Sequence, residues 1–214
     1  MTSRPNSWNY YARLLDGLAA DSLLNKKATV EALERFASSF DEEVDRSLYR
    51  GDLGVTLARI GNFAEARKII GAVEGHHDRA HYWRRLANEQ FTFGDLPGGL
   101  QSLLLSAEAI EKLREEYSWE RAEIFALGAK LLDDFGLKDD AIKLWQKSID
   151  VAKAGQTHGV DSVDCSAIMT TMAKLLAEAG RFELAKSVAD AIVIPGKRVL
   201  AQQLIDKAVS QKRS

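Results

Sequence analysis

Two clusters of side chains in the sequence have the types and spacing for chemistry, and the first is HHDRAH at residues 76–81. His77 and His81 stand four residues apart, so they share one face of a helix, a spacing that can bind zinc or nickel. A metal site needs three or four ligands, and the neighbouring sequence does not complete such a set. Asp78 has the residue type that caps the N-terminus of a following helix. We therefore expect a solvated junction between helices here, and no bound metal.

The second cluster consists of His158, Asp161, Asp164 and Cys165, in and beside a predicted loop at residues 155–164. A cysteine near a histidine is the pairing of a nucleophile with its base, but no strand–turn–helix context or oxyanion hole accompanies it. We therefore interpret Cys165 as a small buried thiol beside a helix start. The sequence also lacks the motifs of nucleotide-binding loops, zinc proteases and serine hydrolases. It predicts neither enzyme activity nor a cofactor.

The composition indicates which elements must position these residues. Only three of the 214 residues are proline, and the long stretches between them are rich in Ala, Leu, Glu, Lys and Arg, which are strong helix formers. The sequence therefore predicts an all-α protein. Its formal net charge of −2 and isoelectric point of about 6.1 give no excess of positive charge, so we expect no nucleic-acid partner.

Composition and patterning also bear on the compartment. The single cysteine excludes an internal disulfide and fits a reducing environment. The first residues, MTSRPNSWNYYARLLDG, contain no apolar core followed by a cleavage site, so we expect no signal peptide. No stretch approaches the roughly 18 consecutive apolar residues that a membrane-spanning helix needs. We therefore expect a soluble cytoplasmic protein with no membrane partner.

A repeated spacing of glycines indicates how the helices are connected. Each of these marker glycines ends one helical pattern, a second pattern begins directly after it, and a small residue follows five positions later. The four pairs are Gly61 with Ala66, Gly94 with Gly99, Gly136 with Ala141, and Gly180 with Ala185. Glycine at a helix C-terminus readily adopts a positive φ, and a small residue on the inner face of the next helix lets two helices approach closely. The pattern therefore predicts hairpins of two antiparallel helices joined by a tight turn.

These hairpins resemble the tetratricopeptide repeat (TPR), a family of stacked helix–turn–helix units. Large and small residues stand at the family's spacings in four segments: Leu53, Gly54, Gly61, Ala66, Ile70 and Val73; Trp83, Leu86, Ala87, Gly94, Gly99 and Leu103; Phe125, Ala129, Leu132, Gly136, Ala141 and Trp145; Met169, Met172, Ala173, Gly180, Ala185 and Ala189. The marker glycines lie 33, 42 and 44 residues apart, and we attribute the excess over the family's period of about 34 to longer helices and the 155–164 loop. The resemblance implies a right-handed α-solenoid with about four hairpin repeats over residues 45–193.

The two ends of the chain lack the marker spacing, as capping units of a solenoid do. Residues 1–41 read as two amphipathic N-terminal capping helices, and residues 196–212 read as a C-terminal capping helix that follows a break at Pro195. No flexible linker separates these parts, so we expect a single domain over residues 1–214. The aromatic residues Trp8, Tyr10 and Tyr11 either cap the solenoid or form a docking or dimerisation patch.

The resemblance also implies a binding surface, because the first helix of each TPR unit lines a concave groove. The candidate groove residues, mapped by this resemblance, are His81, Arg84, Arg85, Asn88, Phe91, Lys130 and Lys174. Arg84 and Asn88 resemble the Lys/Asn pair with which some TPR domains hold a peptide's C-terminal carboxylate, and the two lysines take the place of Asn88 in later units. Cationic and amide donors in a line can hold a carboxylate or an acidic segment. Alternatively, these side chains only solvate the exposed face of long helices.

Two functions from different classes remain open at this stage. The first is a protein–protein interaction module or scaffold, such as a chaperone or regulatory adaptor, that binds a peptide or helix of another protein in the groove. The alternative is a self-associating structural component, in which the N-terminal aromatic helices or the last helix of one copy fill the groove of the next.

Overall fold

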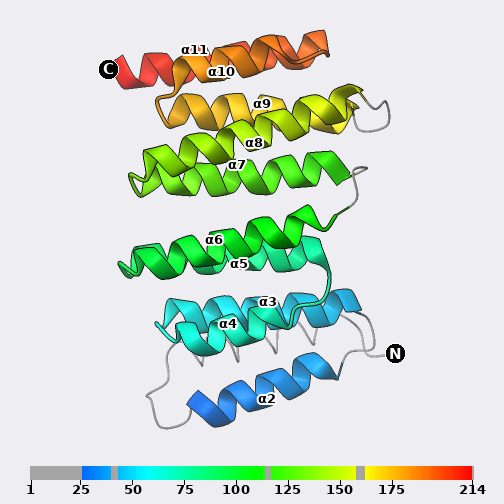
Figure 1. The fold of residues 1–214 in the computed structure, drawn as a ribbon, viewed down its shortest axis with the longest axis vertical. Helices are drawn as coiled ribbons and strands as arrows, with labels where there is room; N and C mark the ends of the chain where they lie inside the picture. The colour runs from blue at the N-terminus through cyan, green and yellow to red at the C-terminus, as the bar shows by residue number, and fades with distance from the viewer. Residues whose placement is uncertain (1–25, 40–42, 114–116, 158–161, 214) are drawn as a thin grey trace. The chain divides into compact units, whose positions relative to one another are not determined.

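The computed structural model describes residues 26–39, 43–113, 117–157 and 162–213, and these residues form ten helices and no strand (Figure 1). The all-α fold class is therefore confirmed. The helices are α2 (Lys26–Ser38), α3 (Glu43–Arg59), α4 (Phe63–Gly71), α5 (His76–Thr92), α6 (Leu96–Glu111), α7 (Ser118–Asp134), α8 (Lys138–Thr157), α9 (Ser162–Glu178), α10 (Phe182–Asp190) and α11 (Pro195–Arg213).

The chain forms two compact units, Met1–Ala109 and Ile110–Ser214. In the first unit α3 packs against α2, α4 and α5, and α4 also contacts α5. In the second unit α9 packs against α7, α8, α10 and α11, while α7 contacts α8 and α10 contacts α11. Within each unit the helices follow one another in chain order (Figure 1). The single domain over residues 1–214 stays a prediction.

The four marker glycines form the turns that the sequence predicts. Gly61, Gly94, Gly136 and Gly180 have φ between 77° and 80°, and no described non-glycine residue has a positive φ. At the first turn the amide of Asn62 donates to the Leu57 carbonyl, and the amide of Gly61 donates to the Ala58 carbonyl, each at 2.9 Å. The same pair of bonds recurs at the other three turns. This is the Schellman motif, which satisfies carbonyls that the helix end leaves open.

The small residue five positions after each marker glycine lies in the interior, as expected from the pattern. Ala66, Ala141 and Ala185 are fully buried, and Gly99 is buried against the ring of Phe91. A Cβ atom added at Gly99 would lie 2.3 Å from Phe91 Cε1, so the ring fills the space that a side chain would take. The absence of a larger side chain therefore lets α5 and α6 pack closely.

A second repeated feature, not expected from the sequence, ties successive helices together. The hydroxyl of Ser106 donates to the Ala80 carbonyl at 2.7 Å, and the hydroxyl of Ser148 donates to the Ala122 carbonyl at 2.6 Å. Both bonds are buried, and each joins residues 26 positions apart. In the pair α3 and α4 the direction is reversed, since Ser47 near the start of α3 donates to the carbonyl of Glu74, which follows α4, at 2.8 Å.

Three local expectations differ from the structure. Asp78 lies inside the first turn of α5, because Gly75 at φ 77° takes the N-cap position and the helix begins at His76. The loop expected at residues 155–164 is shorter, since α8 continues to Thr157 and α9 begins at Ser162. The N-terminal helix containing Trp8, Tyr10 and Tyr11 lies outside the described residues.

The C-terminal helix begins where the sequence predicts a break. Pro195 is the first residue of α11, a position that suits its fixed φ and its missing amide hydrogen. Ala201, Ile205 and Ala208 form the buried stripe of this helix. Among the described helices, none combines the length and apolar character needed to cross a membrane.

Candidate functional site

The seven candidate groove residues are divided between the two units. Five of them, from His81 to Phe91, lie on α5 in the first unit, while Lys130 lies on α7 and Lys174 on α9 in the second unit. The environment of each side chain decides what it can offer to a ligand.

The joint between α3 and α5 is closed by a tyrosine that lies on a glycine. A Cβ atom added at Gly51 would lie 1.9 Å from Tyr82 Cε2, so the ring packs directly on the backbone of α3. The Tyr82 hydroxyl donates to the carbonyl of Leu48 at 3.3 Å, and burial raises the pKa of Tyr82 well above its ordinary value. The absent side chain at Gly51 is therefore filled from within the protein, and this part of the joint has no room for a ligand.

Arg85 is engaged by the same joint. Its Nη1 donates to Asp52 Oδ1 at 3.0 Å, and its guanidinium lies over the Tyr82 ring, 5.5 Å from the centroid. Burial raises the pKa of the Asp52 carboxyl, and the hydrogen bond and charge of Arg85 act against that rise. An anionic ligand would have to compete with Asp52 for Arg85.

His81 lies beside this cluster as a neutral hydrogen-bonding group. Its ring meets the Tyr82 ring edge-on, with centroids 5.6 Å apart. Burial, followed by the charges of Arg84 and Arg85, lowers the pKa of His81 to about 4, so the imidazole is uncharged near pH 7. In the part of the chain that the structure describes, no group of three or more His, Cys, Asp or Glu side chains is arranged to hold a metal ion.

Of the remaining α5 residues, Arg84 and Asn88 are half-buried and lie one helical turn apart. Phe91 must be removed from the candidate surface, because it is only 3% exposed and its ring occupies the space beside Gly99. The sequence carries a signal for this: Gly99 is the small residue of the second marker pair, and a small residue needs a large partner across the helix contact.

The two lysines of the second unit each pair with an acid one turn later on the same helix. Lys130 donates to Asp134 Oδ1 on α7, and Lys174 lies 3.7 Å from Glu178 on α9. Such exposed i,i+4 pairs contribute about 0.3–0.5 kcal/mol each, so a ligand carboxylate could replace the acid at little cost.

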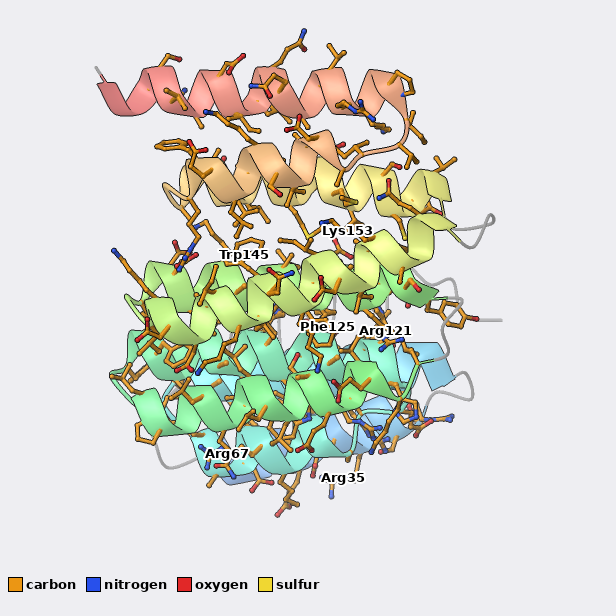
Figure 2. The ribbon with its side chains drawn as sticks, turned by 45° about the horizontal axis from the view of Figure 1, so that its top comes forward. Arg35, Arg67, Arg121, Phe125, Trp145 and Lys153 are labelled. Carbon is orange, nitrogen blue, oxygen red and sulfur yellow. The ribbon has the colours of Figure 1, made fainter. Side chains whose placement is uncertain are left out.

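Sequence reasoning missed a charged cluster between α2, α3 and the end of α4. Arg46 and Arg50 both bind the Glu74 carboxylate, at 2.9 and 3.0 Å, and the hydrogen bond from Arg46 is the largest cause that lowers the pKa of Glu74. Arg50 also forms part of an open cleft of about 530 Å³, whose other lining residues are Glu31, Glu34, Arg35, Ser38, Ser39 and Ala72 (Figure 2 labels Arg35). The cleft mixes acids with bases, and one of its two arginines, Arg50, is already bound to Glu74, so its charge favours no particular ligand.

A second cluster missed from the sequence lies in the second unit. Arg181 contacts both carboxylate oxygens of Asp133, at 2.6 Å from Nη2 and 2.8 Å from Nε, and the Trp145 indole donates to the same carboxylate at 2.8 Å (Figure 2 shows Trp145 on α8). Burial alone raises the pKa of Asp133, but the hydrogen bonds from Arg181 and Trp145 outweigh it and hold that pKa below its ordinary value. The cluster ties α7, α8 and the turn before α10 together. Its role is structural, because the carboxylate is only 7% exposed.

In the first unit the candidate residues are therefore Arg84, Asn88 and neutral His81 on α5, together with Arg85, which is bound to Asp52. In the second unit Lys130 and Lys174 are each paired to an acid of their own helix. Comparisons of the chain with protein-family models, with curated proteins and with solved structures find no match.

Proposed function

We propose that the protein is a TPR-like helical-repeat module whose first-helix face binds an acidic peptide or helix of a partner protein, as a scaffold, chaperone or regulatory adaptor. The observation that carries the proposal is the recurrence of one turn: four marker glycines, each at φ 77–80°, each with the same two backbone bonds. The buried serine-to-carbonyl bonds at a separation of 26 residues add support for a repeated unit. Stacked helical repeats present long, pre-formed surfaces, which suit them to binding extended segments.

The chemistry of the face supports an anionic ligand. In the first unit Arg84 supplies positive charge, Asn88 supplies an amide, and neutral His81 supplies a donor or acceptor without charge. In the second unit Lys130 and Lys174 supply positive charge. The two lysines are held only by single-turn ion pairs, which a ligand carboxylate can replace. From the composition we infer that the protein binds its partner without catalysis and without a cofactor. The single cysteine, which is buried, leads us to infer a cytoplasmic setting.

Self-association is the second candidate, and one observation favours it. The start of α11 exposes two large apolar side chains, Val199 at 57% and Leu200 at 43%. In this alternative the last helix of one copy packs on a neighbouring copy, and no external peptide is bound.

A charge-reversal experiment with a matched control tests the proposal. The test variant carries Arg84→Glu, Lys130→Glu and Lys174→Glu, and the control carries Lys68→Glu, Lys143→Glu and Lys186→Glu. The control residues are exposed lysines, and each forms an i,i+3 ion pair on the helix that follows a marker glycine, namely α4, α8 or α10. Both variants change the net charge equally, and far-ultraviolet circular dichroism verifies equal helicity.

Capture from lysate under crosslinking, with quantitative mass spectrometry, gives the readout. The proposal expects a protein that wild type and control retain and the test variant loses, and the crosslinked peptides of that protein should be acidic. Equal capture by all three proteins would refute the assignment of this face. Light scattering across a concentration series tests self-association. Oligomers formed by the wild type, but not by a Val199→Ser, Leu200→Ser double variant, would favour it.

A further inference from the structure

An apolar patch lies exposed where α5 passes into α6, and we name Phe63, Phe93 and Leu96 the turn patch. Phe93 is 55% exposed and Leu96 is 43% exposed. The Phe93 ring meets the Phe63 ring of α4 edge-on, with centroids 5.4 Å apart. Two segments about thirty residues apart in the chain therefore join in one aromatic surface.

The exposure is particular to this turn and is not imposed by the turn geometry. Phe135 occupies the corresponding position directly before Gly136, and it is half-buried. Lys138 stands where Leu96 stands in the earlier turn, so the equivalent position of the second unit carries a charge. At the other two turns the same two positions, Ile60 with Phe63 and Ala179 with Phe182, are half-buried. A large aromatic and a leucine left open together at one of four similar turns indicate a contact surface.

Arg67, which is close to Phe63 of the turn patch in the sequence, has one buried donor without a partner in the described structure. Arg67 is one helical turn after Phe63 on α4 (Figure 2 labels Arg67). Its Nε is buried without a hydrogen-bond partner in the described structure, and its Nη2 lies 3.9 Å from Asp95 Oδ2, beyond hydrogen-bond reach. Both oxygens of Asp95 already accept other bonds, from the Gln90 amide and the Gly98 backbone, each at 3.0 Å.

Arg59 is a second arginine near the turn patch, and it is more exposed than Arg67. Arg59 is 59% exposed, and its Nε lies 3.5 Å from Glu89 Oε1, a long contact with a carboxylate that is mostly buried. Glu89 is one turn before Phe93 on α5, so this pair also borders the patch. Arg59, at 59% exposure, is far more open than its partner Glu89, at 17%. Arg67 and Asp95 are about equally exposed, at 36% and 37%, but both oxygens of Asp95 already accept other bonds, so the hydrogen-bonding capacity left beside the patch is that of guanidinium donors.

From this asymmetry we propose that the turn patch binds an acidic segment of another protein that carries a large apolar side chain. The apolar side chain covers Phe93 and Leu96, and flanking carboxylates accept hydrogen bonds from Arg59 and Arg67. An aromatic centre with a charged border is the arrangement of an interface hot spot. The turn patch contains none of the seven candidate groove residues, so it acts independently of the groove.

The experiment begins with a display library of short random peptides selected on the full-length protein. Enriched sequences are synthesised with a fluorescent label and titrated by fluorescence anisotropy. The test variants are Phe93→Ser, Arg59→Gln and Arg67→Gln. The matched controls are Leu104→Ser, which removes an exposed leucine of α6, and Lys68→Gln, which removes an exposed cation of α4. Circular dichroism checks that each variant keeps the helicity of the wild type.

The proposal expects enriched peptides that place Asp or Glu beside Phe, Leu or Trp. Phe93→Ser should weaken binding about tenfold or more, and each arginine variant about two- to fivefold, while both controls bind as the wild type does. Binding by the wild type should weaken with added salt, and less steeply in the arginine variants.

Three results would overturn the proposal: no enrichment, enriched peptides without acids, or affinity that Phe93→Ser leaves unchanged. A wild-type dimer that Phe93→Ser dissociates would also overturn it, by assigning the patch to a second copy of the chain. The Arg84, Lys130 and Lys174 substitutions leave the turn patch intact. The proposal for the turn patch can therefore be refuted or supported independently of the proposal for the groove.

Discussion

Replacing Arg181 by methionine should destabilise the second unit more than any other single loss of a surface charge described above. The methionine keeps much of the apolar stem but leaves the Asp133 carboxylate, which is 7% exposed, with the Trp145 indole as its remaining partner among those described. Breaking a fully buried ion pair by removing one partner costs about 3–5 kcal/mol. The Arg181 side chain retains 21% exposure, so water screens part of the pair and we expect a loss of about 2–3 kcal/mol.

Urea unfolding followed by tryptophan fluorescence is the assay, because Trp145 reports directly on the cluster. Lys186→Met is the control, since Lys186 and its partner Glu183 are both exposed and should change stability by less than about 0.5 kcal/mol. In the double variant Asp133→Asn, Arg181→Met no charge is left buried, and the amide oxygen still accepts from Trp145. Its loss should therefore shrink to about 1 kcal/mol.

The pH dependence gives an independent check of the same pair. Because the pKa of Asp133 is lowered in the folded protein, the pair stabilises the fold above the unfolded pKa of about 3.8. That stability is lost as the pH falls through the lower folded pKa, and Arg181→Met should remove this part of the acid sensitivity. If Arg181→Met costs no more than Lys186→Met, or if the double variant is as unstable as the single one, the reasoning is refuted.

Two further predictions concern the turns and the α5 face. Gly94→Ala should lower stability by about 1–2 kcal/mol in thermal unfolding, because φ is 80° there and nothing obstructs the added methyl group. Gly196→Ala is equally unobstructed but lacks the positive φ, so it should be near neutral. Equal effects of the two substitutions would show that backbone conformation is not the cause. For His81 the folded pKa of about 4 lies below the unfolded 6.5, so the unfolded state binds the extra proton and stability falls as the pH drops from 6.5 towards 4. His81→Gln should reduce this fall by about 1–2 kcal/mol after allowance for solvent screening, and an unchanged slope between pH 6.5 and 4.5 in urea titrations would contradict the assignment.

The sequence predicts the turns well because their chemistry is local. A glycine that ends a helix and a small residue on the next helix are set by neighbours within one turn, so Gly61, Gly94, Gly136 and Gly180 can be located from spacing alone. The helix content follows from composition in the same way. The predicted start of α5 is wrong by three residues, because Gly75 and Asp78 both suit an N-cap and only the backbone decides between them.

The chemistry of the candidate site could not be predicted to the same degree. Whether Arg85 is available depends on Asp52, 33 residues earlier, and Arg181 is held by Asp133, 48 residues earlier. Pairings at such separations follow from how helices pack, which periodicity does not specify. The burial of Phe91 was in principle readable from Gly99, but only once the two positions are known to face each other.

The contact between Tyr82 and Gly51 has a consequence for the geometry of the first unit. A ring that rests on bare backbone makes the separation of the α3 and α5 axes depend on the size of one side chain. In a row of packed helices, the spacing of each neighbouring pair adds to the pitch and curvature of the whole row. A graded series of substitutions at position 51, from alanine to serine to valine, would therefore change the tilt between α3 and α5 in steps that follow the size of the side chain.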